Sequence, residues 1–172
     1  MSSEAAISAL SADWTREHKH WGAWSPGRSL LASIRCYQRH AGRRGPYHMA
    51  FRWGCVLRHR FWSAISGADI PLNSRIGGGL LIPHPNGIVI HPACEIGPNC
   101  LIFQQVTIGS GKGGVPTLGG HVDVGAGAKI LGAVQVGNHA VIGANAVVVD
   151  DVMESTTVVG IPARQVSSQA RR

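Results

Sequence analysis

The chain of 172 residues has few charged and few aromatic side chains, at 15% and 6% of its residues. It has no apolar run that approaches the ~20 residues of a membrane-spanning helix. Residues 1–25 lack a continuous apolar core, so we expect no signal peptide. No Cys-x-x-Cys pair is present, and the nine histidines have no supporting ligand spacing, so we expect no metal site. We expect all four cysteines to be reduced thiols in a cytoplasmic protein: Cys36, Cys55, Cys94 and Cys100.

What the chain does have is glycine, 23 residues of it, and an aliphatic residue at every sixth position. Glycine weakens helix interiors, so this content favours short strands and tight turns. The pattern is aliphatic-Gly-x-x-small-x, in which the aliphatic and the small side chain both point into a triangular coil. Neither a helix of period 3.6 nor a strand of period 2 explains it. The aliphatic positions are Ile76, Ile82, Ile88, Ile96, Ile102, Ile108, Val124, Ile130, Val136, Ile142 and Val148.

This repeat predicts a mainly β fold: a left-handed parallel β-helix of hexapeptide repeats, preceded by a short α-helical N-terminal region. We expect the helical region over residues 1–68 and the β-helix over residues 69–166, with a polar tail at 167–172. Residues 110–121 break the period and indicate an extruded loop. The repeat ends near Glu154.

The region before the repeat shows helical periodicity. We expect one helix around Leu30–Tyr37, a second from Pro46 to Ile65, and a weaker one over Ala5–His18. Residues 1–75 hold eleven of the sixteen Lys and Arg residues but four of the nine acids, a balance of +7. Such a segment is either an ordinary solvated helical face or a surface that faces an anionic glycan, a membrane or a nucleic acid. We expect no nucleic-acid binding, because no recognised module accompanies the charge.

Four segments of the chain together resemble the serine acetyltransferase family, over about residues 67–166. They read ADIPLNSRIGGGLLIPHPNGIVIHPACEIG, FQQVTIGSGKGG, VGAGAKILGAVQVG and VVGIPARQV. The IPHPNGIVIHP variant is also similar to acetyltransferases of exopolysaccharide gene clusters. The resemblance implies an acetyl-CoA-dependent O-acetyltransferase that assembles as a homotrimer, with acetyl-CoA bound along the coils between adjacent subunits.

The resemblance also assigns roles to particular residues. It places a catalytic pair at His84 and Asp69, in which the histidine takes the proton of the acceptor hydroxyl and the carboxylate orients the imidazole. A hydroxyl is a weak nucleophile at neutral pH, so it needs such a base. For the bound acetyl-CoA it implies contacts with Ser110, Ala126, Lys129, Ala144 and Arg164.

The chain departs from the family where the family's serine enzymes hold the amino acid. Pro83 stands where they carry an Asp before the catalytic His, and the loop GKGGVPTLGG lacks their Arg-His pair. A zwitterion normally needs charged partners. The acceptor is therefore either L-serine, bound by a modified site, or a hydroxyl of a sugar or exopolysaccharide precursor. An inactive hexapeptide scaffold is a third reading, which the retention of both His84 and Asp69 disfavours.

Overall fold

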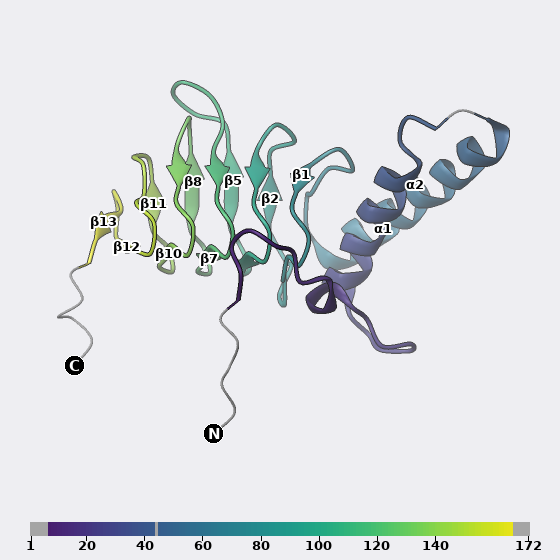
Figure 1. Cartoon of the computed structure of the whole chain (residues 1–172), viewed down its shortest axis with the longest axis horizontal. Helices are drawn as coiled ribbons and strands as arrows, with labels where there is room; N and C mark the ends of the chain where they lie inside the picture. Colours follow the sequence, from purple (N-terminus) through teal and green to yellow (C-terminus); the bar gives the residue numbers. More distant parts are fainter. Residues whose placement is uncertain (1–6, 44, 167–172) are drawn as a thin grey trace.

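The protein consists of a stack of short strands with two helices at one end (Figure 1). The structure, a computed structural model, describes residues 7–43 and 45–166. A 3-10 helix, η1 (Trp14–Glu17), precedes α1 (Pro26–His40) and α2 (Pro46–Ser66). No helix within these residues is both long enough and apolar enough to cross a membrane. The predicted fold, a mainly β protein with a parallel β-helix after a short helical region, is confirmed.

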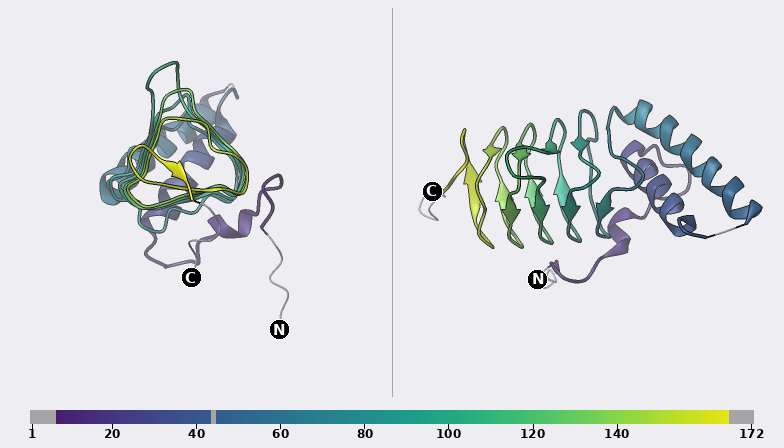
Figure 2. Two further views of the ribbon diagram at one scale, coloured as in Figure 1. Left: turned by 90° about the vertical axis from the view of Figure 1, so that its left-hand side faces the viewer. Right: turned by 90° about the horizontal axis from the view of Figure 1, so that it is seen from above.

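Three parallel sheets form the sides of the β-helix, and the stack is triangular when seen along its axis (Figure 2). The first sheet contains β1 (Arg75–Ile76), β3 (Glu95–Ile96), β6 (Thr117–Leu118) and β9 (Gln135–Val136). The second contains β4 (Leu101–Ile102), β7 (Asp123–Val124), β10 (Val141–Ile142), β12 (Thr157–Val159) and β13 (Arg164–Gln165), the last of which pairs antiparallel. The third contains β2 (Val89–Ile90), β5 (Thr107–Gly109), β8 (Lys129–Leu131) and β11 (Val147–Val148).

The aliphatic positions of the repeat fall in register from coil to coil and fill the interior. In the third sheet, Ile90 pairs with Ile108, Ile108 with Ile130, and Ile130 with Val148. The prediction of Ile88 as the aliphatic position of the first coil was wrong by two residues, because the insertion in the repeat lies before Ile90 and not after Ile88. The four paired side chains are at most 1% exposed. Burying one such side chain contributes about 1.5–3 kcal/mol, so the stacked interior is the main stabilising feature of the domain. The small positions are fully buried as predicted: Cys100, Ala128, Ala140 and Ala146.

The repeat differs from its sequence pattern in two further places, at the protruding loop and at its C-terminal end. The break expected at residues 110–121 is shorter, because β6 resumes the first sheet and places Leu118 in register with Ile96. The protruding loop therefore covers residues 110–116. The solenoid also continues past Glu154, since β12 pairs with β10 and seats Val158 beside Ile142. Insertions and deletions at the corners hide both positions from a fixed six-residue count.

The N-terminal segment is an extended strap rather than the expected weak helix. Within its described part, residues 7–17, η1 alone is helical, and the Asp13 side chain caps it by accepting from the Thr15 N–H at 3.0 Å. Asn99, which is fully buried, donates to the carbonyls of Ser8 at 2.7 Å and Ser11 at 2.8 Å. These contacts hold the backbone against the β-helix and compete with a helical conformation.

The helices are anchored to the first coil by a largely buried ion pair. The Arg35 guanidinium lies 2.8 Å from the Glu17 carboxylate and also donates to the carbonyls of Ile76 and Gly77, both at 2.6 Å. Glu17 in turn accepts from the Gly79 N–H at 2.9 Å. Charged groups thus satisfy backbone groups of the first coil, which has no preceding coil to pair with.

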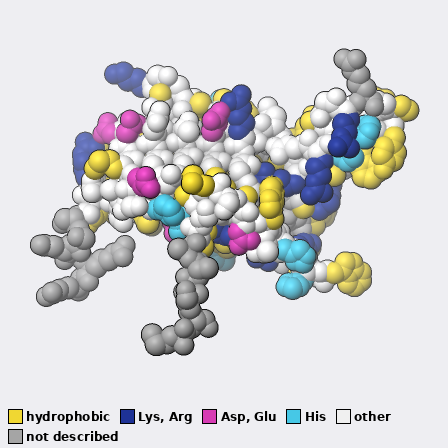
Figure 3. Space-filling view, in the orientation of Figure 1, with side chains coloured by type: hydrophobic (Ala, Val, Ile, Leu, Met, Phe, Trp, Pro, Cys, Tyr) yellow, Lys and Arg dark blue, Asp and Glu magenta, His cyan; other side chains and the backbone are white. Residues whose placement is uncertain are grey.

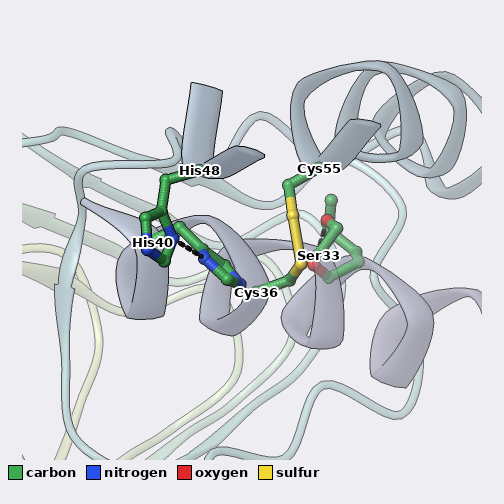
Figure 4. The surroundings of a disulfide bond; sticks show 6 residues. Ser33, Cys36, His40, His48 and Cys55 are labelled. Carbon is green, nitrogen blue, oxygen red and sulfur yellow. Dashed lines mark hydrogen bonds between the residues drawn. A yellow bond between two sulfur atoms is a disulfide. The ribbon is translucent and has the colours of Figure 1, made fainter. Parts of the chain in front are cut away.

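The prediction that all four cysteines are reduced thiols was wrong for two of them. Cys36 of α1 and Cys55 of α2 form a disulfide, with their Cα atoms 6.1 Å apart (Figure 4). The pairing arises because the two helices pack face to face, which a separation of 19 residues does not reveal. Cys94 and Cys100 are free and buried. Burial raises the pKa of both thiols, and that of Cys100 reaches about 11.

Thiol titration with a chromogenic disulfide reagent will test this division. At about pH 8 we expect no reaction from the folded protein, because Cys94 and Cys100 are buried and stay protonated. Unfolding without reductant should expose two thiols, and unfolding after reduction all four cysteines. Four reactive thiols on unfolding without reductant would contradict the disulfide.

Candidate active site at one corner of the β-helix

His84 lies at the corner where the chain passes from the second sheet to the third. Leu81, three residues earlier, bridges to Leu101 of the second sheet, and β2 of the third sheet begins at Val89. The His84 side chain is exposed. Successive coils stack this corner by backbone hydrogen bonds, from the Gln105 N–H to the Asn86 carbonyl at 2.9 Å and from the Asn145 N–H to the Ala126 carbonyl at 2.8 Å. A continuous column of corner residues therefore extends from His84 along the molecule.

Asp69 lies beside the third sheet, immediately before the first coil. Its N–H donates to the Ile88 carbonyl at 2.8 Å, and its carbonyl accepts from the Ile90 N–H at 3.0 Å. Ala68 and Ile70 on either side are buried, so alternation directs the Asp69 carboxylate outwards. Within residues 7–43 and 45–166, no hydrogen bond joins the Asp69 and His84 side chains. The catalytic pair therefore stays a prediction, made on two exposed side chains of adjoining segments.

Three of the five residues expected to contact acetyl-CoA belong to the same corner column. Ala126 and Ala144 occupy the corner in successive coils, where the Gly125 N–H donates to the Ile142 carbonyl at 2.8 Å. Lys129 follows this corner at the start of β8, and its ammonium donates to the backbone carbonyl of Gln105. Small side chains and one cation thus line the same edge of the third sheet as His84.

The other two expected contacts lie elsewhere in the chain. Ser110 follows β5, at the opposite edge of the third sheet, where the protruding loop begins. Arg164 is in β13 at the far end of the stack, where its guanidinium lies 2.9 Å from the Asp150 carboxylate. Both partners of that ion pair are about two-thirds exposed, at 66% and 67%, so the pair adds little stability and leaves Arg164 available to a ligand.

Two polar residues of the corner were not singled out from the sequence. The Gln105 carboxamide donates to the Asn86 carboxamide oxygen at 3.0 Å, close to Gly87. Gln105 has a left-handed backbone, with φ of 60°. Asn86 lies two residues after His84 in IPHPNG, and Gln105 lies in FQQV. Their position in segments that resemble the family is the signal that could have identified them. These amides provide hydrogen-bonding groups at the corner that carries His84.

The chain is similar to curated serine acetyltransferases, although no family model matches it. It is 47% identical over 105 residues to the serine acetyltransferase of Synechococcus elongatus, covering 58% of this chain and 43% of that protein. It is 45% identical over 108 residues to the serine acetyltransferase of Helicobacter pylori, covering 60% of this chain and 63% of that protein. The chain thus spans about half the length of these curated relatives.

Solved structures extend the likeness to the helices. Neisseria gonorrhoeae serine acetyltransferase in complex with serine matches with a TM-score of 0.69 and 33% identity, over 84% of this chain and 58% of that chain. A serine acetyltransferase in complex with CoA gives 0.68 and 33%, over 83% and 57%. The soybean serine acetyltransferase apoenzyme gives 0.61 and 32%, over 80% and 69%. The fold is a hexapeptide-repeat β-helix, and its candidate site is a corner of the β-helix that exposes His84. The protein belongs to the serine acetyltransferase family.

Gly87→Ala will test how tightly this corner is built. Gly87 has φ of +70°, and an added Cβ would lie 2.6 Å from atoms of the Gln105 carboxamide. We expect a loss of about 1–2 kcal/mol in the free energy of unfolding, measured by denaturant titration, because the left-handed backbone disfavours a Cβ. Gly54→Ala is the control. Nothing lies within 4 Å of its added Cβ on a helix, so it should stabilise by about 0.5–1 kcal/mol. Equal changes in the free energy of unfolding for the two variants would contradict the left-handed, closely packed conformation of Gly87.

Proposed function

We propose that this protein is an acetyl-CoA-dependent, serine O-acetyltransferase-like enzyme in which His84 acts as the general base. The observation that carries the proposal is the position of His84. It is exposed at the head of a corner column that also presents Ala126, Lys129 and Ala144. Membership of the serine acetyltransferase family supports the reaction class, and related structures hold serine or CoA.

The reaction joins an acceptor hydroxyl to the acetyl group of the thioester. His84 removes the hydroxyl proton as the oxygen attacks the thioester carbonyl, and the C–S bond then breaks. The proton passes from the imidazolium to the departing CoA thiolate, so that the products are an acetyl ester and free CoA. Backbone N–H groups at the corner are suited to stabilise the negative charge that develops on the thioester oxygen.

Asp69 is proposed to orient His84 during this step. A carboxylate near an imidazolium lowers its energy and favours one ring tautomer. The Asp69 carboxylate faces outwards, and the Asp69 backbone pairs with residues 88–90. Those residues follow His84 closely in the chain. A side-chain rotation on binding of the acceptor would bring the two groups together, since catalytic hydrogen bonds often tighten only in the complex.

The donor is proposed to bind along the corner column, with its amides against the small residues Ala126 and Ala144. Lys129 and Arg164 are suited to the phosphates of CoA as exposed or half-exposed cations. Ser110 begins the loop on the opposite edge of the third sheet, so a single chain does not bring it to this corner. We therefore propose a homotrimer, in which a neighbouring subunit supplies the second wall of the donor site.

A sugar or exopolysaccharide hydroxyl is the alternative acceptor, and the protruding loop favours it. Within residues 110–116 Lys112 is the charged residue, and it is exposed. One cation serves a carboxylate but leaves the ammonium of serine without an anionic partner on this loop. We place the enzyme in the cytoplasm, with its basic helices facing an anionic partner.

The first test is release of free CoA thiol from acetyl-CoA in the presence of L-serine. We expect His84→Ala to reduce the rate by about 10²–10⁴-fold, the usual contribution of a general base. His139→Ala is the control, since His139 lies at another corner, hydrogen-bonded to His121 at 2.8 Å, and should leave the rate unchanged. An unchanged rate for His84→Ala would contradict its role.

The acceptor is tested separately, with CoA binding as the reference. If acetyl-CoA binds and L-serine causes no release of CoA, the serine proposal fails. Release with sugar acceptors that is lost in His84→Ala would then establish the alternative. If neither acceptor class supports release while acetyl-CoA still binds, the protein is a binding scaffold and not an O-acetyltransferase.

A further inference from the structure

Helix α2 has one face packed into the protein and one face open to solvent. The inner face buries Cys55 and Ser66 and places the His59 ring 2.8 Å from the Ile70 carbonyl. Arg52 on this side donates to the Tyr37 hydroxyl of α1 at 3.1 Å. The hydrogen bonds of these polar side chains are therefore directed inwards, and the outer face has a different composition.

The outer face of α2 carries an apolar stripe, formed by Trp53, Leu57, Phe61 and Ile65. These residues are spaced by four, so they share one side of the helix. Their exposed fractions are 64%, 63%, 56% and 46%. Over twelve residues the stripe is about 18 Å long at a helical rise of 1.5 Å per residue. Large apolar side chains in such a row are a mark of a binding surface rather than of ordinary surface composition.

The charge around the stripe has a single sign. Between Glu17 and Asp69 the sequence contains nine Lys and Arg residues and no acid. Arg58 and Arg60 are exposed on α2 next to the stripe. Figure 3 shows dark-blue and yellow side chains gathered over this helix at the right of the view. The surface therefore offers apolar area and positive charge together.

A second copy of the same face is a poor partner for this surface. A two-fold contact would bring two acid-free, cationic helices together, and like charges facing each other cost binding energy. A nucleic acid would satisfy the arginines but offers no apolar environment for Leu57 and Ile65. An anionic bilayer offers both, since its headgroups attract Arg and its acyl boundary takes up the apolar face.

We propose that α2 binds the surface of an anionic phospholipid bilayer, with the stripe inserted at the headgroup boundary and Arg58 and Arg60 on the lipid phosphates. Such a helix lies in the plane of the interface, as expected for one that is not apolar enough to cross. The helices stand at one end of the β-helix, so this contact leaves the sheets free (Figure 1). Binding to lipid does not depend on the proposed reaction.

The test is co-sedimentation of the full chain with vesicles of phosphatidylcholine alone and of an equal mixture of phosphatidylcholine and phosphatidylglycerol. We expect binding to the mixed vesicles that weakens as salt is added. Replacing three residues of the stripe, in W53S/L57S/F61S, should weaken it at least tenfold, because the inserted apolar area is lost. The variant R58Q/R60Q should weaken it about fivefold for each arginine removed.

A matched control replaces exposed apolar residues of the β-helix. Val149→Ser with Met153→Ser removes side chains that are 49% and 67% exposed, and should leave binding unchanged. Circular dichroism of each variant confirms folding. Equal binding to neutral and mixed vesicles, or equal loss in the control, would overturn the proposal. So would wild-type protein that ignores vesicles but forms a larger assembly in light scattering than W53S/L57S/F61S, since the stripe would then cover a second copy.

Discussion

The structure depends on the hydrogen-bond ladder between successive coils. Strands of two or three residues have no stability alone, and each is held by the coil above and below it. The Thr107 N–H donates to the Ala128 carbonyl at 3.0 Å, and the Lys129 N–H donates to the Ala146 carbonyl at 2.8 Å. Because this ladder fixes the register, the same side of the triangle must present an inward aliphatic residue in every coil. The six-residue period in the sequence results from that constraint.

The ladder also decides where chemistry can be placed. Interior positions are restricted to aliphatic and small side chains, whereas the corners lie outside the core and tolerate histidine, asparagine, glutamine and inserted loops. His84, Gln105 and Ala126 therefore share one edge although about twenty residues of chain separate each from the next. The open first coil needs its own closure, and Arg35 with Glu17 supplies it. One physical rule thus accounts for the core, the site and the helical end.

Charge divides the molecule in the same way as structure does. Residues 76–172 contain five basic and five acidic residues, while the acid-free stretch before Asp69 carries the excess of cations. The β-helix is therefore suited to a donor held by backbone amides and a few cations, and the helices are suited to a broad anionic surface. An enzyme held by its helices at a bilayer would present its corner site to hydroxyl groups near that surface, a situation that joins the two proposals without making either depend on the other.

The sequence by itself determined the β-helix, its aliphatic and small interior positions, the two main helices and the family, because each of these follows from a local period or a contiguous motif. It misplaced the aliphatic position of the first coil, at Ile88 instead of Ile90, the end of the loop at Leu118 and the last coil at Val158, since irregular corners shift the six-residue count. Only the tertiary structure decided that Cys36 and Cys55 form a disulfide and that Asn99 holds the N-terminal strap. It also decided that Lys129 lies at the same corner as His84, whereas Ser110 and Arg164 lie elsewhere. Those contacts join residues far apart in the chain, and their partners are set by how helices and coils pack, for which no local pattern exists.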